Sequence, residues 1–463
     1  MCGVFGVFNA LHAEKYIFYG IYALQHRGQE GVGLAVSDFE DIKVVKKPGL
    51  VLEAIKKEDL EAVKGYSGIA HVRYSTAGDA GDQNFQPILR ETPLGKVAVV
   101  HNGNLVNYLP LRAELESKGV SFFHTSDSEL FLALLGQGEL LPEGIQFHPS
   151  DRELLPALFY VLSRVKGAYS LLYLFKDRLV AARDPMGFRP LLLGRLRETF
   201  LFASESCAFD ILQAETWREL KPGEVLVVDA QGMRSYFPFR SEKKSMCIFE
   251  LVYFSKPESF VFDSWVYRAR RRMGELLAYE DDVSADVVVP VPDSGLVPAI
   301  GYAQVRGLPL ELGLIRNHYV GRSFIEPTQE LRDVKVLMKL NPNRAVLEGK
   351  RVVVVDDSLV RGTTSKKIVS MLRRAGAKEV HMRIASPPVI GPCYYGIDTP
   401  TREELIANRM ELEEIREFIG ADSLRYLSLE SLHSVVESPQ DFCDACFSNC
   451  YPLEVEGTAL RMR

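Results

Sequence analysis

The chain reads Val352-Val353-Val354-Val355-Asp356-Asp357-Ser358-Leu359-Val360-Arg361-Gly362-Thr363-Thr364-Ser365 in the stretch that decides its fold. Consecutive valines are typical of a strand buried on both faces, as in a parallel sheet. This strand brings Asp356 and Asp357 to its carboxyl end, where ligands bind in open α/β sheets. A glycine loop then opens a helix, whose amino end can bind phosphate through unpaired N–H groups and the helix dipole. Carboxylates beside a phosphate suit ribose hydroxyls and Mg²⁺; a turn in which they cap the helix is the alternative.

The elements around this stretch alternate between strands and helices. Residues 365–374 have amphipathic helical spacing, and Ala375-Gly376 ends the helix. Residues 286–291 and 380–385 are further β-branched or apolar strands, so the second half should be α/β and doubly wound. Residues 402–419 are a charged stretch that favours a helix.

The first half has a different sequence pattern, with short apolar strands between glycine-rich turns. We expect strands at 97–100, 169–175 and 191–194, and a helix at 111–118 before Gly119. The polar stretch at 229–244 is the best boundary. The expected domains are therefore 2–235 and 236–463.

Composition limits the class of protein. The 463 residues carry a net charge of −6, 25% charged residues and seven cysteines, which excludes disordered, collagenous and disulfide-scaffold classes. A chain without an extended basic block is a poor nucleic-acid binder, and no apolar run approaches the roughly 18 residues that cross a bilayer. An odd cysteine count without a signal peptide indicates a reducing compartment, so we expect a cytoplasmic protein.

Cys2 follows the initiator methionine. Removal of Met1 would make it the first residue, so that the free α-amine could take the thiol proton. A small buried residue in an N-terminal strand is the alternative. The segments that favour a nucleophile come in order: Cys2-Gly3-Val4-Phe5-Gly6, Leu24-Gln25-His26-Arg27-Gly28-Gln29-Glu30-Gly31, His71-Val72-Arg73-Tyr74-Ser75-Thr76, His101-Asn102-Gly103-Asn104 and Ser126-Asp127-Ser128-Glu129.

This set resembles the glutaminase domain of the N-terminal-nucleophile amidotransferases, an α+β fold that is an αββα sandwich. The resemblance implies that Cys2 is the nucleophile and that Asn102 and Gly103 form the oxyanion hole. It also implies that Arg73 binds the α-carboxylate of glutamine and Asp127 its α-ammonium. Two further residues, Arg27 and Gly28, would lie on a loop that closes over the bound glutamine.

The second half resembles the α/β type I phosphoribosyltransferases. The resemblance implies that Pro290-Val291-Pro292-Asp293-Ser294-Gly295 binds diphosphate and that Mg²⁺ is held by Ser294, Asp356 and Asp357. Residues 316–333 would be a mobile lid, with an ordinary surface loop as the alternative, and Lys339 is a diphosphate partner or a solvated lysine. The expected contacts of phosphoribosyl diphosphate are Asp293, Ser294, Gly295, Lys339, Asp356, Asp357, Arg361, Gly362, Thr363, Thr364 and Ser365.

Together the two halves resemble the glutamine phosphoribosylpyrophosphate amidotransferase family over nearly the full chain. That family hydrolyses glutamine and passes ammonia to phosphoribosyl diphosphate, giving 5-phosphoribosylamine, glutamate and diphosphate at the entry to purine synthesis. The family is oligomeric, so a homotetramer or homodimer is expected, and purine nucleotides inhibit it. The alternatives are another glutamine amidotransferase, such as the one that makes glucosamine 6-phosphate, or a non-catalytic protein that binds phosphoribosyl diphosphate.

The remaining cysteines include a C-x₂-C pair, Cys443 and Cys446. From the residues alone this pair suggests zinc, a redox site or no function. The iron–sulfur-containing bacterial branch of the resembled family implies instead a [4Fe–4S] cluster on Cys247, Cys393, Cys443 and Cys446. Cys450 could compete with Cys446 as a ligand, whereas Cys207 should be a packed small residue.

Overall fold

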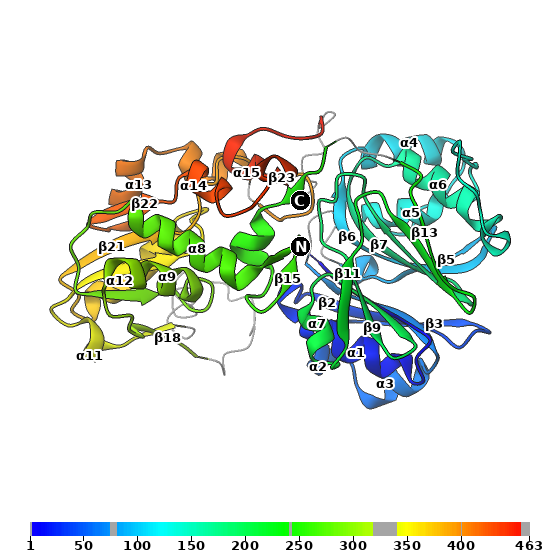
Figure 1. The fold of residues 1–463 in the computed structure, drawn as a ribbon, viewed down its shortest axis with the longest axis horizontal. Helices are drawn as coiled ribbons and strands as arrows, with labels where there is room; N and C mark the ends of the chain where they lie inside the picture. Colours follow the sequence, from blue (N-terminus) through cyan, green and yellow to red (C-terminus); the bar gives the residue numbers. More distant parts are fainter. Residues whose placement is uncertain (1, 75–80, 240–242, 318–339, 400, 455–463) are drawn as a thin grey trace.

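The computed structural model describes residues 2–74, 81–239, 243–317, 340–399 and 401–454. Figure 1 shows two parts side by side: a sandwich of sheets built from the first half, and a smaller layered part built from the second. Lys339 and most of the expected lid (318–333) lie outside the described residues.

The first part contains two antiparallel sheets. The seven-stranded sheet has the order β11 (Glu215–Glu219), β9 (Leu192–Leu196), β10 (Thr199–Ala203), β1 (Gly3–Phe8), β4 (Ser67–Arg73), β2 (Gly31–Ser37), β3 (Ile42–Pro48). The six-stranded sheet has the order β13 (Gly232–Tyr236), β12 (Val225–Asp229), β8 (Arg178–Arg183), β7 (Gly167–Leu174), β6 (Gly95–Leu105), β5 (Ile88–Thr92).

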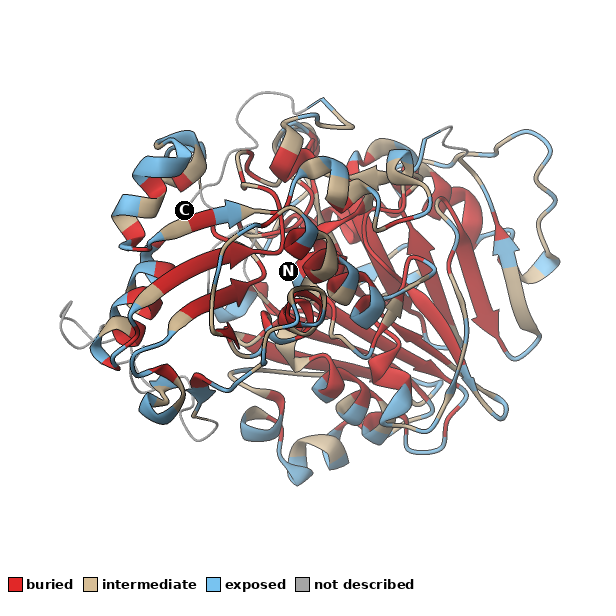
Figure 2. Cartoon of the chain, turned by 60° about the vertical axis from the view of Figure 1, so that its left-hand side comes forward, coloured by how far each residue is buried: buried red, intermediate tan, exposed pale blue. Residues whose placement is uncertain are grey.

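Side chains point alternately to the two faces of each strand, which explains how the two sheets stack. On β7, Leu172 and Leu174 join the core between the sheets, whereas Tyr169, Leu171 and Tyr173 join the core outside the six-stranded sheet. Figure 2 shows that buried residues follow the strands of both sheets. Helices cover the outer faces: α1 (Ala13–Ala23) and α7 (Cys207–Asp210) on one side, and α4 (Tyr108–Ser117), α5 (Leu130–Ala133) and α6 (Leu154–Arg164) on the other. The predicted αββα sandwich is confirmed.

The second part is a parallel sheet with helices on both faces. Its strands are β17 (Val287–Pro290), β20 (Arg351–Asp356), β21 (Glu379–Ile384) and β22 (Ser423–Tyr426), in that order. On β20, Val353 and Val355 face the core that contains α8 (Val266–Tyr279) and α9 (Leu296–Arg306). Its other valines, Val352 and Val354, face α12 (Thr363–Arg374) and α13 (Leu412–Ile419). The strand is buried on both faces, as its consecutive valines predict.

The chain reverses its winding direction between β17 and β20. After α9 it returns beside β17 at Leu310, which forms a parallel bridge to Val288, and only later crosses to β20 on the other side of β17. Such a reversal opens a crevice outside the carboxyl ends of the two strands. The residues that follow β17 and β20, Val291 to Gly295 and Asp357 to Gly362, therefore meet at one edge of the sheet.

One predicted helix was wrong in part. Within 402–419 only α13 is an α-helix, and two short 3₁₀ turns, Arg402–Glu404 and Ile406–Asn408, precede it. The N–H of Ile406 donates to the carbonyl of Val360 at 3.0 Å, so a tertiary contact with the glycine loop replaces the helical hydrogen bond. The other predicted elements are confirmed within a few residues at their ends.

Short elements join the two parts. A π-helical turn, Glu250–Phe254, lies between them, and one hydrophobic core continues from α1 through this turn to α8. No described helix is long and apolar enough to cross a bilayer. The remaining elements are α2 (Val51–Ala54), α3 (Lys57–Ala62), α11 (Arg344–Leu347), α14 (Leu429–His433), α15 (Ala445–Ser448) and the strand pairs β14 (Met246–Cys247) with β23 (Phe442–Cys443), β15 (Phe260–Val261) with β16 (Ser264–Trp265), and β18 (Leu314–Arg316) with β19 (Leu340–Pro342).

Candidate active sites and cysteine pocket

Cys2 lies directly before β1, the central strand of the seven-stranded sheet. Its side chain is half-buried, and its Sγ donates to the carbonyl of Tyr74 at 3.5 Å. Tyr74 follows Arg73, the last residue of the neighbouring strand β4. The thiol is therefore held at the end of the sheet where the Arg73 segment also ends.

Asn102 and Gly103 lie on β6, which packs across the sandwich on β1 and β4. The Asn102 side chain is fully buried, and neither its Nδ2 nor its Oδ1 has a hydrogen-bond partner among the described residues. Gly103 has φ 153°, and a Cβ there would lie 2.0 Å from the carbonyl oxygen of Ala168. A buried amide without a partner costs free energy unless a ligand uses it, so this position suits an oxyanion donor.

Arg73 and Asp127 border the same region. Arg73 is 3% exposed, and its Nη1 donates to the carbonyl of Asn84 at 2.8 Å. Asp127 is equally buried, and its Oδ2 accepts the N–H of Leu105, two residues beyond Gly103, at 2.9 Å. A guanidinium and a carboxylate at the rim of one site can bind the carboxylate and the ammonium of an amino acid.

Arg27 is fully buried in an ion-pair network. Its Nε donates to the carbonyl of Cys2 at 3.0 Å, its Nη1 to Glu205 at 2.5 Å and its Nη2 to Glu250 at 2.8 Å. Burial alone would lower the pKa of Arg27, but the two carboxylates raise it and keep the guanidinium charged. This geometry makes Arg27 a residue that holds the backbone of Cys2. Its expected place on a loop over glutamine stays a prediction.

Gly28 packs on the end of β4. A Cβ at this position would lie 2.6 Å from the backbone carbon of Val72, so only glycine allows the approach. The segment that contains Arg27 and Gly28 therefore packs against the adjoining ends of β1 and β4.

Asp356 and Asp357 lie at the carboxyl end of β20, and both are buried. The N–H of Asp357 donates to Asp356 Oδ1 at 3.0 Å, and Ser358 Oγ donates to Asp357 Oδ2 at 2.5 Å. Burial, and then the neighbouring carboxylate of Asp357, raise the pKa of Asp356 well above its usual range. Two adjacent buried carboxylates repel each other when both are ionised. A divalent cation suits such a pair, because its positive charge offsets the repulsion between the carboxylates.

The diphosphate loop lies against the same strand end. A Cβ at Gly295 would lie 2.2 Å from the carbonyl oxygen of Val355, and Ser294 forms a hydrogen bond that lowers the pKa of Asp356. The side chain of Asp293 is exposed and pairs with Arg316 at the end of β18. The structure therefore brings both predicted loops of the second half together at the switch point of the sheet.

The glycine loop forms the amino end of α12. Gly362 has φ 75°, a conformation that favours glycine, and a Cβ there would lie 2.7 Å from Ile406 Cδ1. Thr363 and Thr364 are exposed in the first turn, whereas Ser365 is buried. The Arg361 side chain reaches outward and pairs with Glu404 at 3.2 Å. The first-turn N–H groups of a helix of this length can bind a phosphate.

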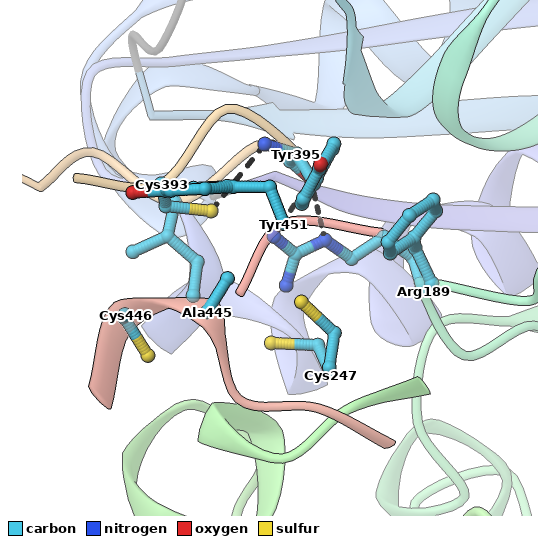
Figure 3. Close-up of a pocket in the computed structure, with 10 residues that line it drawn as sticks. Arg189, Cys247, Cys393, Tyr395, Ala445, Cys446 and Tyr451 are labelled. Atoms are coloured by element: carbon cyan, nitrogen blue, oxygen red, sulfur yellow. Dashed lines mark hydrogen bonds between the residues drawn. The ribbon is translucent and has the colours of Figure 1, made fainter. Parts of the chain in front are cut away.

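The four predicted cluster ligands converge on one pocket, drawn in Figure 3. Its lining comprises Phe188, Arg189, Cys247, Cys393, Tyr395, Ile397, Cys443, Ala445, Cys446 and Tyr451. Burial raises the pKa of the Cys247 thiol to about 11, and it also raises the pKa values of Cys443 and Cys446. Cys450 is exposed and does not line this pocket. Cys207 is packed in the core of the first part, as predicted.

The four cysteines line the same pocket. Among the described residues, no three His, Cys, Asp or Glu side chains are arranged as ligands of one metal ion. The space between the thiols is bordered by Arg189, whose Nε and Nη2 donate to the carbonyl of Tyr395 at 3.0 and 2.7 Å (Figure 3).

The acidic partners of Arg27, and the contacts of Arg189 with Glu250 and Tyr395, were not predicted from the sequence. Glu205 and Glu250 are fully buried, and Arg189 Nη1 lies 3.4 Å from Glu250 Oε1. The available signal was an acidic residue inside each of two otherwise small or apolar strings, 203–207 and 247–254. Such a residue is often a buried counter-ion, but its partner is fixed only by the packing of the two parts.

Comparisons with known proteins agree with the domain family expected for each half of the chain. The glutamine amidotransferase domain family matches residues 71–210, and the phosphoribosyl transferase domain family matches residues 268–385. The chain is 49% identical to the chloroplastic amidophosphoribosyltransferase of Glycine max, over 98% of this chain and 79% of that protein. It is 46% identical to the amidophosphoribosyltransferase of Methanocaldococcus jannaschii, over 98% of both chains.

A solved structure agrees over nearly the whole chain. Glutamine phosphoribosylpyrophosphate amidotransferase from B. subtilis, complexed with ADP and GMP, is 45% identical, with a TM-score of 0.90 over 99% of this chain and 98% of that one. The chain therefore belongs to the amidophosphoribosyltransferase family, enzymes of purine biosynthesis that combine a glutamine amidotransferase domain with a phosphoribosyltransferase domain.

Proposed function

We propose that residues 2–235 hydrolyse glutamine at Cys2 and that residues 236–463 join the released ammonia to phosphoribosyl diphosphate. The products are glutamate, diphosphate and 5-phosphoribosylamine. The observation that carries this assignment is the fully buried, unpartnered amide of Asn102 beside Gly103, on the strand that packs against the nucleophile's sheet. The alternative amidotransferase that makes glucosamine 6-phosphate does not fit, because the second half matches a phosphoribosyl transferase domain.

In the glutaminase half, each residue acts on a different part of the substrate. The Cys2 thiol gives its proton to the α-amine that removal of Met1 exposes, and the sulfur attacks the carboxamide carbon. Asn102 Nδ2 and the Gly103 N–H stabilise the negative oxygen of the tetrahedral intermediate. Arg73 and Asp127 hold the α-carboxylate and the α-ammonium of glutamine. Ammonia leaves, and water hydrolyses the thioester.

Arg27 and Gly28 position this site. The hydrogen bond from Arg27 Nε to the carbonyl of Cys2 keeps the first residue at the end of β1, and Gly28 lets the segment lie against β4. We assign them to holding the nucleophile, and a direct contact of this segment with glutamine stays a prediction.

In the second half, phosphoribosyl diphosphate would bind across the switch point. The first turn of α12 receives the 5-phosphate through Gly362, Thr363, Thr364 and Ser365, with Arg361 beside it. Asp356 and Asp357 receive the ribose hydroxyls, and the 293–295 loop receives the diphosphate. Lys339, outside the described residues, stays a predicted diphosphate partner.

Magnesium fits the oxygen ligands of this site, of which the two carboxylates are buried. Ser294, Asp356 and Asp357 would hold it, and the bound cation would neutralise charge on the diphosphate as it leaves C1 of the ribose. The raised pKa of Asp356 supports this, because the carboxylates need a cation to ionise together.

A [4Fe–4S] cluster fits the chemistry of the cysteine pocket, because all four cysteines line one buried space. A cluster spreads its four thiolate ligands around its core, and such a group would hold the carboxyl-terminal segment in place. Cys446, which lines the pocket, is the proposed ligand in preference to the exposed Cys450.

We also propose feedback inhibition by purine nucleotides, since the similar B. subtilis enzyme is complexed with ADP and GMP. A homotetramer or homodimer in the cytoplasm is proposed from the family resemblance and from the reducing environment that free thiols need. No nucleic-acid or membrane partner is proposed.

Two substitutions test the assignment of one reaction to each half of the chain. Cys2→Ala should abolish glutamine-dependent synthesis of 5-phosphoribosylamine and leave ammonia-dependent synthesis intact, because only the first reaction needs the thiol. Asp357→Ala should weaken binding of phosphoribosyl diphosphate, measured by calorimetry with Mg²⁺, and should lower both activities. Loss of both activities in Cys2→Ala, or unchanged affinity in Asp357→Ala, would remove the corresponding assignment.

A further inference from the structure

We infer that Tyr394, Tyr395 and Gly396 of the phosphoribosyltransferase half, called here the 394–396 segment, position the oxyanion hole of the glutaminase and connect it to the cysteine pocket. This inference rests on the proposed role of Gly103. It concerns residues that lie almost 300 positions beyond the site they support.

Three adjacent residues of this segment contact the glutaminase half. The side-chain Nδ2 of Asn104 donates to the carbonyl of Tyr394 at 3.1 Å. Arg189 donates twice to the carbonyl of Tyr395, at 3.0 and 2.7 Å. These bonds attach the segment both to the residue after Gly103 and to a fully buried arginine of the first half.

Gly396 completes the contact by touching Gly103 itself. A Cβ at Gly396 would lie 2.9 Å from the carbonyl carbon of Gly103, 3.0 Å from its Cα and 3.1 Å from its oxygen. Gly103 also approaches Ala168 of β7 so closely that a Cβ at Gly103 would lie 2.0 Å from the Ala168 oxygen. The backbone of Gly103 is therefore held between β7 and the 394–396 segment, which fixes the direction of its N–H.

The other end of the segment belongs to the cysteine pocket. Cys393 precedes it, and the N–H of Tyr395 donates to Cys393 Sγ at 3.4 Å. The Tyr395 ring stacks on Phe188, another pocket residue, with 4.4 Å between the ring centres. A change in the pocket that moves Cys393 must therefore also move the groups that hold Gly103.

The decisive substitution is Gly396→Ala, with Gly420→Ala as its matched control. Both glycines have positive φ, 106° and 77°, so alanine is strained at each. Only Gly396 touches the glutaminase; a Cβ at Gly420 would meet one atom, Val369 Cγ1, at 3.9 Å. Gly396→Ala should lower the glutamine-dependent kcat about 10- to 100-fold, since a displaced oxyanion donor loses much of its effect.

Three further readouts separate positioning from general damage. The KM for glutamine should stay within about threefold, because Arg73 and Asp127 are untouched. Ammonia-dependent synthesis should be unchanged, because it does not use Gly103. Alkylation of Cys2 by iodoacetamide should keep its rate, since that displacement forms no oxyanion.

The inference is overturned by a Gly396→Ala kcat within twofold of the parent, by a parallel loss of Cys2 alkylation, or by an equal loss in Gly420→Ala. If Gly396→Ala does not fold, Asn104→Ala decides: a selective fall of about fivefold in the glutamine-dependent kcat supports the inference, and no change overturns it. Failure of the proposed function is distinguishable, because it would show as retained glutamine-dependent activity in Asn102→Leu.

Discussion

Replacement of Asn102 by leucine should remove glutamine-dependent activity and at the same time stabilise the ligand-free protein. The two effects have one cause. The Asn102 amide is fully buried on β6, and neither of its polar atoms has a hydrogen-bond partner among the described residues. The unpaired amide therefore destabilises the ligand-free fold, and it gains a hydrogen-bond partner only when the oxyanion of the transition state forms.

The expected changes in stability and in kcat follow from the burial of the unpaired Asn102 amide. An unsatisfied buried polar group costs about 1–3 kcal/mol, and an apolar side chain of similar shape removes that cost. Asn102→Leu should therefore raise the free energy of unfolding by about 1–3 kcal/mol. Loss of an oxyanion donor should lower the glutamine-dependent kcat by about 10²- to 10³-fold.

Asn107→Leu is the matched control. Asn107 is also buried, but its Nδ2 donates to the carbonyl of Arg164 at 2.9 Å and its Oδ1 accepts the N–H of Lys166 at 2.8 Å. Leucine here removes two hydrogen bonds to the partly exposed backbone of Arg164 and Lys166, so we expect a loss of about 1–3 kcal/mol.

Thermal unfolding measures the stability effect. A change of 1 kcal/mol shifts the Tm of a domain of 150–250 residues by about 2–4 °C. Asn102→Leu should unfold at a higher temperature than the parent, and Asn107→Leu at a lower one. Glutaminase assays with saturating phosphoribosyl diphosphate measure the activity. A destabilised Asn102→Leu, or one that keeps full glutamine-dependent activity, would refute the reasoning.

The remaining predictions concern buried charge and metal. Arg27→Met should destabilise the protein by about 3–5 kcal/mol, because Glu205 and Glu250 lose their main cation, whereas Arg195→Met breaks an exposed pair and should change the Tm little. Burial raises the pKa of Asp184 to about 6, so its stabilising contribution is full below about pH 4 and is lost as the pH rises through 6. The Tm difference between parent and Asp184→Asn should therefore move in favour of the variant from pH 4 to pH 7, and a constant difference would contradict the assignment. Protein purified without oxygen should be brown and contain about four iron and four sulfide per chain, and zinc alone would exclude the cluster.

The individual strands and loops were predictable where neighbouring residues determine them. Four consecutive valines require burial on both faces, and β20 is buried on both. Gly362 and Gly103 stand where a positive φ is needed, and the strings that contain them predicted both sites. The stretch 402–408 was not predictable, because the bond from Ile406 to Val360 outweighs its helical preference.

The contacts between distant segments were not predictable in the same way. The sequence resemblance named Cys247, Cys393, Cys443 and Cys446, but only the structure places them around one pocket with Arg189. The bonds from Arg27 to Glu205 and Glu250, and the contact of Gly396 with Gly103, likewise span long stretches of chain.

The sequence by itself therefore determined the two folds, and it indicated the proposed nucleophile and the proposed phosphate-binding end of α12. These depend on side-chain alternation, helix ends and glycine positions, which act over a few residues. Only the tertiary structure decided how the two halves are joined: which carboxylates neutralise Arg27, which amide is left unpaired, and which segment holds Gly103. Those choices depend on packing and desolvation at the junction of the halves, where a buried charge or amide is stable only if the facing surface supplies its partner.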